Sequence, residues 1–348
     1  MASVVGHGAL DEALKDRLAI VEERLRDAVS QSDRLADATS RHLVNAGGKR
    51  LRPALTLLTA HLGDASRPEV VDAAVVVELT HLATLYHDDV MDSAPTRRGA
   101  PAAHEVWGNS VAILTGDLLF ARASSVVAGL GPQAVRIQAE TFERLCLGQL
   151  HETVGPSEGD DPVEFYLQVL ADKTGSLIAT SARFGAMFAG CAPDVVQQVT
   201  RYGELAGVAF QLADDVIDVR SDAATTGKTP GTDLREGVAT MPVLLLRRRV
   251  AAGAAASSSR DSAQSSRAEP RDLGDDANLL AAIDGDLSDD AVLADVVARL
   301  AAHPVVDETA ALAATWAARA AEAIAPLPEG DVKDSLIAFA DALVVRAA

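Results

Sequence analysis

The 348-residue chain has few aromatic residues, few cysteines and an excess of acidic over basic residues. Aromatics make up 3% of the sequence while hydrophobic residues make up 48%, so alanine, leucine and valine must form most of the core. Two cysteines, Cys146 and Cys191, cannot provide a disulfide framework and favour a reducing, cytoplasmic setting. The 31 basic and 50 acidic residues leave a net charge of −19, which argues against a binder of nucleic acid or anionic membranes.

Long apolar runs are also missing from the sequence. No run reaches about 18 residues, which predicts that the chain has no transmembrane helix. Residues 1–16 carry acidic side chains where an export signal needs an apolar stretch, so we expect no such signal.

Helical periodicity dominates what is present. Leu10, Leu14, Leu18 and Val21 recur at helical spacing, and alanine and leucine are strong helix formers. No convincing alternating strand pattern occurs, and glycine and proline stand where helices are expected to end. The sequence therefore predicts an all-α fold in a single domain over residues 1–348.

Residues 251–273 differ from the rest of the chain. They are rich in alanine, serine and arginine and show no apolar periodicity. Such a segment buries too little surface to offset its ordering entropy. We therefore predict a disordered insertion between two helices of the same domain.

A pattern of acidic residues stands out in the apolar helical stretch 78–92. Asp88 and Asp92 are four positions apart, so they are predicted to project side by side from one helix face. Two carboxylates facing a core are costly to bury unless a cation lies between them. Magnesium takes one or two carboxylates together with waters and substrate phosphates. A single DDxxD pattern also fits a solvated helix face.

The same pattern recurs at Asp214, Asp215 and Asp218, again among apolar neighbours. Helix bundles build metal sites from side chains on facing helices. The second copy makes two solvated faces an improbable coincidence and predicts several divalent cations held between two helices.

Lysine is scarce, with 5 residues against 26 arginines (31 − 5). Three of these lysines, Lys49, Lys173 and Lys228, stand in motifs with glycine. A compact ammonium binds phosphate as a point charge, whereas arginine binds it as a fork. The pair Arg97 and Arg98 adds a fork-type anion site. A lysine beside glycine can also cap a helix, so the interpretation rests on the set.

In this order the motifs resemble the trans-isoprenyl diphosphate synthases, the polyprenyl synthetase family. The resemblance covers residues 10–345 apart from 251–273. It implies an all-α bundle of about a dozen helices around a deep central cavity, assembled as a homodimer. The matching motifs are GGKRLRP (47–53), HDDVMD (87–92), RRG (97–99), GD (116–117), GQ (148–149), KTG (173–175), FQLADDVID (210–218) and the segment 227–242.

The resemblance implies a prenyltransferase that joins isopentenyl diphosphate to an allylic diphosphate with two or three Mg²⁺ ions. The implied metal ligands are Asp88, Asp92, Asp214 and Asp218. The residues implied for isopentenyl diphosphate are Lys49, Arg52, His81 and Arg98. Those implied for the allylic diphosphate are Arg97, Lys173, Thr174, Gln211 and Lys228. Catalysis is implied for Asp88, Asp92, Asp214, Lys173 and Arg97.

Product length depends in this family on the fourth and fifth residues before the first motif, where aromatics give short products. Here these residues are Thr84 and Ala83, which implies heptaprenyl to decaprenyl products, the range of quinone side chains. Such a product is strongly apolar and implies transient membrane contact at its release. Other, unaligned helices form the cavity floor, so the exact length and the primer stay open.

Three alternatives remain. A shorter-chain geranylgeranyl or farnesyl diphosphate synthase would differ only in its product. A class I terpene cyclase shares the first motif but usually replaces the second, which is intact here. A non-catalytic subunit of a heteromeric synthase tends to lose motifs that this chain retains.

Overall fold

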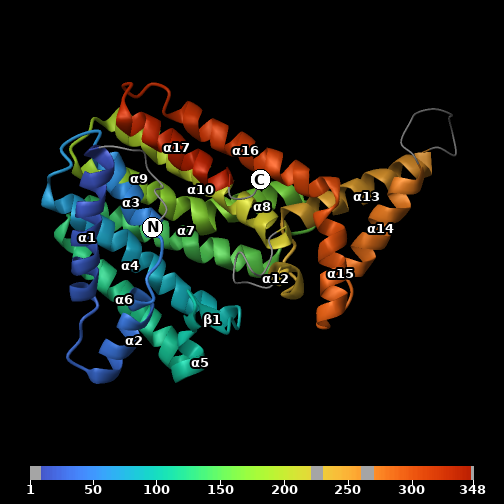
Figure 1. Ribbon diagram of the computed structural model, residues 1–348, viewed down its shortest axis with the longest axis horizontal. Coiled ribbons are helices and arrows are strands. Elements are labelled where there is room, and N and C mark those ends of the chain that lie inside the picture. Colours follow the sequence, from blue (N-terminus) through green and yellow to red (C-terminus); the bar gives the residue numbers. More distant parts are fainter. Residues whose placement is uncertain (1–8, 221–229, 260–269, 346–348) are drawn as a thin grey trace.

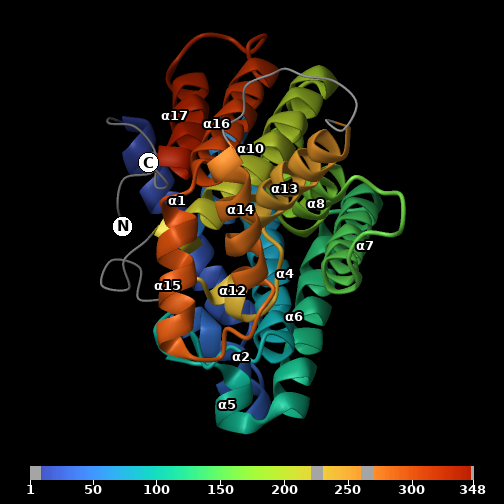
Figure 2. The same ribbon diagram turned by 90° about the vertical axis from the view of Figure 1, so that its right-hand side faces the viewer.

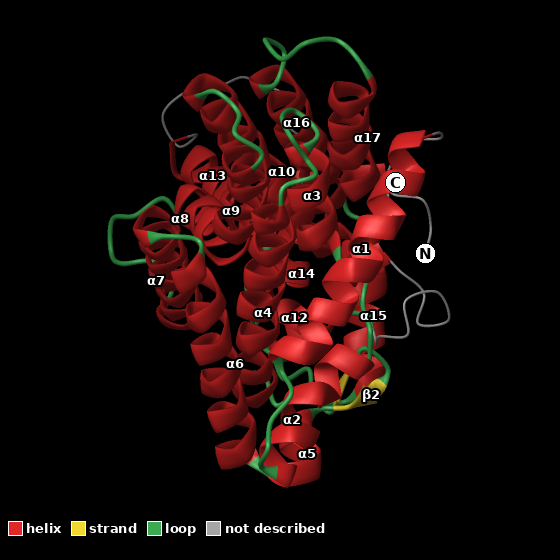
Figure 3. Cartoon of the chain, turned by 90° about the vertical axis from the view of Figure 1, so that its left-hand side faces the viewer, coloured by secondary structure: helices red, strands yellow, loops and turns green. Residues whose placement is uncertain are grey.

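The computed structural model describes residues 9–220, 230–259 and 270–345 (Figure 1). Helices dominate this part of the chain, and Figure 3 shows how little strand accompanies them. The helices are α1 (Ala9–Ala28), α2 (Arg34–Asn45), α3 (Leu51–Ala60), α4 (Pro68–Met91), α5 (Ala103–Trp107), α6 (Asn109–Gly129), α7 (Pro132–Val154), α8 (Pro162–Leu170), the π-turn η1 (Ala171–Gly175), α9 (Ser176–Phe188), α10 (Pro193–Arg220), α12 (Thr232–Arg235), α13 (Met241–Ser259), α14 (Pro270–Ile283), α15 (Asp290–Ala301), α16 (Pro304–Ala323) and α17 (Asp331–Val345). Strands β1 (Thr96–Arg97) and β2 (Ala100–Pro101) pair antiparallel. The predicted all-α fold is confirmed.

The two aspartate motifs lie on helices α4 and α10, which are packed on several sides. Helix α4 contacts α3, α6 and α9, while α10 contacts α9, α16 and α17. A helix surrounded by other helices is apolar around most of its circumference, and α4 follows this rule. The packing of the bundle therefore fixes the positions of the two helix ends that carry these carboxylates.

Small side chains allow the helices to approach closely. A methyl group on Gly185 of α9 would lie 2.0 Å from the carbonyl oxygen of Thr56 on α3. The buried tyrosines are anchored by hydrogen bonds, as where Tyr202 donates to the carbonyl of Leu336 at 2.7 Å. The core is thus built mainly of alanine, leucine and valine, as the composition predicts.

The predicted disordered loop over 251–273 is wrong at both ends. Helix α13 continues to Ser259 and α14 begins at Pro270, and the two lie side by side as a hairpin that projects from the bundle (Figures 1 and 2). Residues between these two helix ends lie outside the described part. Alanine has the highest helix propensity and sustains a helix without apolar periodicity. An ion pair at 3.1 Å between Arg249 and Asp276 also joins the two helices.

Helices α4 and α6 are long and apolar enough to cross a membrane by length and composition alone, a test that the core helices of soluble proteins also pass. In α4, 72% of the 18-residue apolar stretch is buried, so its composition is that of a core helix. In α6 the share is only 33%, and Leu114 is 65% exposed. Within the described residues, one face of α6 remains apolar and uncovered.

Candidate active site

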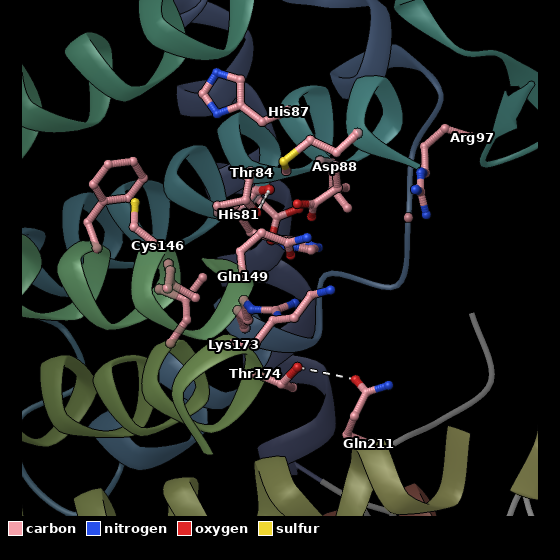
Figure 4. A pocket seen from close by; sticks show the side chains of 18 of the residues that line it. His81, Thr84, His87, Asp88, Arg97, Cys146, Gln149, Lys173, Thr174 and Gln211 are labelled. Carbon is pink, nitrogen blue, oxygen red and sulfur yellow. Dashed lines mark hydrogen bonds between the residues drawn. The ribbon is translucent and has the colours of Figure 1, made fainter. Parts of the chain in front are cut away.

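A cavity of about 1040 Å³ lies among α3, α4, α6, α7, the π-turn and α10. Part of its wall is charged and part is apolar. Figure 4 shows Cys146 on the opposite side of the cavity from Arg97, with Lys173 and Gln149 extending between them. The apolar wall comes from Leu85, Ile113, Phe142, Leu145, Leu150 and Leu177. A ligand with an anionic end and a long apolar end fits this division.

Most of the residues chosen from the sequence meet at this cavity. Asp92 and Asp218 stand one helical turn beyond the lining residues Asp88 and Asp214. Lys228 lies outside the described residues. The chosen residues that line the cavity are Lys49, Arg52, His81, Thr84, Asp88, Arg97, Arg98, Lys173, Thr174, Gln211 and Asp214.

The first motif separates its neighbouring carboxylates. Asp88 faces the cavity, and burial raises its pKa to about 6, although Lys173 opposes this shift. Asp89 is 1% exposed, and its Oδ1 accepts a hydrogen bond from Nε of Arg97 at 2.5 Å. Asp92 ends α4 and is exposed beside the cavity. The helical spacing thus turns one carboxylate toward the ligand space and the next into the fold.

The second motif repeats this division on α10. Asp214 lines the cavity, whereas Asp215 is 1% exposed and accepts hydrogen bonds from Tyr166 Oη at 3.1 Å and Met241 N at 3.2 Å. Burial, followed by the charge of Asp233, raises the pKa of Asp215 well above its usual range. Asp215 therefore ties α10 to α8 and to the first residue of α13.

No three His, Cys, Asp or Glu side chains converge into a metal site among the described residues. The arrangement still fits a hard divalent cation, because such ions use one or two carboxylates and complete their shell with water and phosphate oxygens. Asp88 and Asp92 on one helix, and Asp214 and Asp218 on the other, provide two such pairs. A metal there would depend on the ligand's own oxygens.

A basic cluster lies beside the first motif. Arg98 donates to the carbonyl of Gly47, and a methyl group on Gly48 would lie 2.8 Å from its guanidinium carbon. The glycine pair therefore makes room for this side chain. Burial lowers the pKa of Arg52 to about 10, and its buried Nε has no hydrogen-bond partner among the described residues. Such a group is poised to donate to an anion.

His81 lies in the same cluster. Burial, then the positive charges of Arg52 and Arg98, hold the pKa of His81 well below its usual value. The imidazole is therefore neutral near pH 7 and can donate one hydrogen bond without adding charge.

The opposite wall presents Lys173 and Thr174 from the π-turn. Burial alone would lower the pKa of Lys173, but its ion pair with Glu152 raises it, so the ammonium is charged. Thr174 donates to the side-chain oxygen of Gln211 at 3.2 Å, as the dashed line in Figure 4 marks. These groups face Asp88 across the cavity.

The two residues chosen for product length separate. Thr84 lines the cavity, but Ala83 is fully buried, and its carbonyl oxygen lies 3.0 Å from where a methyl group on Gly116 would stand. Neighbouring helix positions point about 100° apart, so one faces the cavity while the other packs against α6. The prediction that Ala83 lines the cavity is therefore wrong.

Comparisons with known proteins decide the family. The polyprenyl synthetase model matches residues 33–269. A nonaprenyl diphosphate synthase of Mycobacterium tuberculosis is 42% identical over 98% of this chain and 96% of its own length. The chain belongs to the polyprenyl synthetase family.

Solved members of the family share the fold over nearly their whole length. A polyprenyl synthase from Caulobacter crescentus, complexed with calcium and isoprenyl diphosphate, has a TM-score of 0.83 and 32% identity, and the match covers 97% of both chains. A geranylgeranyl pyrophosphate synthase from Corynebacterium glutamicum, also complexed with calcium and isoprenyl diphosphate, has a TM-score of 0.81 and 39% identity over 99% of both chains.

One feature of this polyprenyl synthetase site was missed by sequence reasoning. Glu78 is 1% exposed and pairs with Arg50 at 2.7 Å, and it lies 3.8 Å from Arg98. Arg50 adopts a left-handed backbone conformation (φ 51°) and also pairs with Glu22 at 2.5 Å. A buried glutamate three residues before His81 in an apolar helix was the available signal. Glu78 places a buried negative charge beside Arg50 and Arg98 of the basic cluster.

Proposed function

We propose that the protein is an all-trans polyprenyl diphosphate synthase of medium to long product length. The observation that carries this proposal is one cavity with two aspartate helices and a basic cluster on its charged wall and an apolar wall beyond them. The charged wall suits two diphosphates, and the apolar wall suits a growing hydrocarbon chain.

Asp88, Asp92, Asp214 and Asp218 would hold Mg²⁺, which when bound neutralises the negative charge that develops on the departing diphosphate. Both structural neighbours are complexed with calcium, which supports a divalent ion in such a site. The hard oxygen donors of the two carboxylate pairs favour magnesium or calcium over softer metals.

The protein's own groups orient the two substrates. Arg97, Lys173, Thr174 and Gln211 would hold the allylic diphosphate, and Lys228 is proposed to join them. The residues proposed for isopentenyl diphosphate are Lys49, Arg52, His81 and Arg98. Preorganised positive charge stabilises the leaving group most where water is excluded.

The reaction then balances without a dedicated protein base. The allylic C–O bond breaks, and its electron pair leaves with the diphosphate. The double bond of isopentenyl diphosphate attacks the resulting allylic cation and forms the new C–C bond. A proton is lost from the adduct to the departed diphosphate, and the chain grows by one isoprene unit.

Product length is supported by two observations. Thr84 leaves the cavity wall open where an aromatic residue would obstruct it. The Mycobacterium tuberculosis relative that matches 98% of this chain makes nonaprenyl diphosphate, by its name. A shorter, geranylgeranyl product is the second candidate, since Phe142 lines the cavity and the Corynebacterium glutamicum neighbour is 39% identical.

A homodimer is proposed from the apolar outer face of α6 and α7. Large apolar side chains that are exposed there and do not line the cavity are Leu114, Val135, Leu147 and Val154. Exposed large apolar side chains gathered on two neighbouring helices favour a protein–protein contact. We also propose that the chain acts as one domain in the cytoplasm and contacts a membrane transiently when it releases its product.

Incorporation of isopentenyl diphosphate into an allylic primer by the purified chain tests this function. Magnesium-dependent product formation by the single chain is expected, and chelation of the metal should stop it. A chain that turns over nothing alone but does so with an added partner would support the non-catalytic subunit instead. A cyclic hydrocarbon product formed without isopentenyl diphosphate would support a terpene cyclase.

A further inference from the structure

The π-turn η1 carries Lys173 and Thr174 between α8 and α9. The N–H of Ser176 donates to the carbonyl of Ala171, five residues back rather than four. Such turns insert an extra residue into a helix and recur at functional sites. The direction in which Lys173 enters the cavity therefore depends on how this irregular turn is held.

The backbone of the turn is pressed between two helices. A methyl group on Gly148 of α7 would lie 2.6 Å from the backbone nitrogen of Lys173. A methyl group on Gly207 of α10 would lie 2.6 Å from Cα of Gly175. These contacts hold the backbone of the turn against α7 and α10 at two points.

Asp172 makes polar contacts that hold the turn. It is 8% exposed and is not part of the cavity lining. Its Oδ1 accepts from Nε of Arg144 at 2.6 Å, and its Oδ2 accepts from Nε2 of Gln168 at 2.8 Å. Its carbonyl accepts from Oγ of Ser176 at 2.6 Å. Both carboxylate oxygens are therefore engaged, on the side of the turn away from the ligand.

Arg144 joins the turn to both flanking helices. Besides Asp172, its Nη2 donates to Glu204 of α10 at 2.7 Å and to the carbonyl of Ala171 at 3.4 Å. Arg144 stands four residues before Gly148, so both lie on the face of α7 that meets the turn.

We propose that Arg144 is a positioning residue for the allylic diphosphate. Through Asp172 it fixes the rotation of the π-turn, and so the placement of the Lys173 ammonium and the Thr174 hydroxyl. Arg144 does not line the cavity and touches no substrate in this scheme. The inference rests on the proposed function, because it assigns Lys173 and Thr174 to that diphosphate.

The expected effect is on alignment. Glu152 pairs with the Lys173 ammonium, but the stem of lysine is flexible, so a shift of the turn would still move the ammonium relative to the leaving group. A misplacement of about 1 Å costs on the order of 10²-fold in rate. The residues proposed for isopentenyl diphosphate lie at the start of α3, on α4 and in the segment after α4. The hydrogen bonds of Arg144 and Asp172 do not involve these residues.

Steady-state kinetics of Arg144→Ala with Mg²⁺, farnesyl diphosphate and isopentenyl diphosphate tests the proposal. We expect kcat/KM for farnesyl diphosphate to fall about 10²-fold, with KM for isopentenyl diphosphate unchanged. Arg144→Lys keeps one of the two ion pairs and should recover part of the loss. Arg136→Ala is the matched control, since Arg136 lies on the same helix and, within the part of the chain that the structure describes, pairs only with exposed Glu140 at 3.4 Å.

Thermal unfolding and binding of unreactive farnesyl thiodiphosphate separate positioning from misfolding. A folded Arg144→Ala variant that binds the thiodiphosphate more weakly supports the proposal. Unchanged kinetics, or equal loss for both substrates in Arg144→Ala and Arg144→Lys, overturns it. An inactive wild-type chain would contradict the proposed function. An active wild type with an unimpaired Arg144→Ala variant would contradict only the positioning role of Arg144.

Discussion

Oδ1 of Asp89 accepts a hydrogen bond from Nε of Arg97 at 2.5 Å, across the turn that follows α4. Asp89 is thereby committed to holding an arginine at the cavity, while its neighbour Asp88 faces the ligand space. Asp215 and Asp214 divide their roles in the same way on α10. In each motif, one carboxylate is buried and stabilises the fold, and its neighbour in the sequence faces the ligand site.

Replacing Asp88 or Asp214 by alanine should abolish most of the activity. Each variant removes a proposed metal ligand, so we expect the rate to fall by several orders of magnitude, in the range found for major electrostatic groups. The helical content should stay unchanged. Rates compared with those of Asp72→Ala, a half-exposed aspartate on α4 paired with Arg24, check this. A rate like that of the control would remove the metal hypothesis.

The dependence on Mg²⁺ should change with pH. Burial raises the pKa of Asp88 to about 6, and a metal binds only the deprotonated carboxylate. The Mg²⁺ concentration that gives half-maximal rate should therefore rise as the pH falls below about 6. Titrations at several pH values measure this shift. A constant Mg²⁺ requirement down to pH 5 would contradict the proposed role of Asp88.

Without metal, the same carboxylate should destabilise the fold. The pKa of about 6 for Asp88 in the folded chain lies above the usual value of 3.8 for an aspartate, so the folded state holds the proton more tightly than the unfolded chain. The free energy of unfolding should therefore fall as the pH rises from about 4 to about 6. Asp88→Asn should remove this slope, and a persistent slope would assign it to other groups.

Thr84→Phe should shorten the product, because the new ring would enter the cavity that Thr84 now lines. Ala83→Phe is the contrasting variant: Ala83 is fully buried, so overpacking should cost about 1–3 kcal/mol of stability. Mass spectrometry of products and thermal unfolding distinguish the two effects. A full-length product from a folded Thr84→Phe variant would place the length-limiting wall elsewhere.

Leu114→Asp should dissociate the proposed homodimer. Leu114 is 65% exposed on α6, and a charge buried at an apolar interface is strongly unfavourable. Light scattering after gel filtration measures the mass in solution. Leu35→Asp is the control, because Leu35 is 52% exposed on α2. A monomeric wild type, or a dimer that survives the substitution, would contradict this interface.

The helices and the aspartate pairs could be predicted because local spacing determines them. Positions four apart share a helix face wherever the helix lies, so Asp88 and Asp214 reached the cavity as expected. The sequence could not show that Thr84 lines the cavity and Ala83 does not, since this depends on the rotation of α4 against α6. The contacts of Glu78 and Arg144 join distant segments, so their partners could not be predicted, even though an acidic residue in an apolar helix marks the position of Glu78.

The extension of α13 and α14 into the alanine- and serine-rich segment was missed for a different reason. Apolar periodicity indicates burial, and its absence does not exclude a helix that packs little of its surface. Helix propensity and an ion pair between neighbouring helices, as between Arg249 and Asp276 at 3.1 Å, operate without such a pattern.

The length of the product made by the purified single chain tests the central claim most directly. The chain would be supplied with Mg²⁺, isopentenyl diphosphate and, in turn, geranyl, farnesyl and geranylgeranyl diphosphate. We predict an all-trans product of at least heptaprenyl length, read by mass spectrometry. Growth that stops at farnesyl or geranylgeranyl diphosphate would contradict the assigned product class, and no growth from any primer would contradict the assigned reaction.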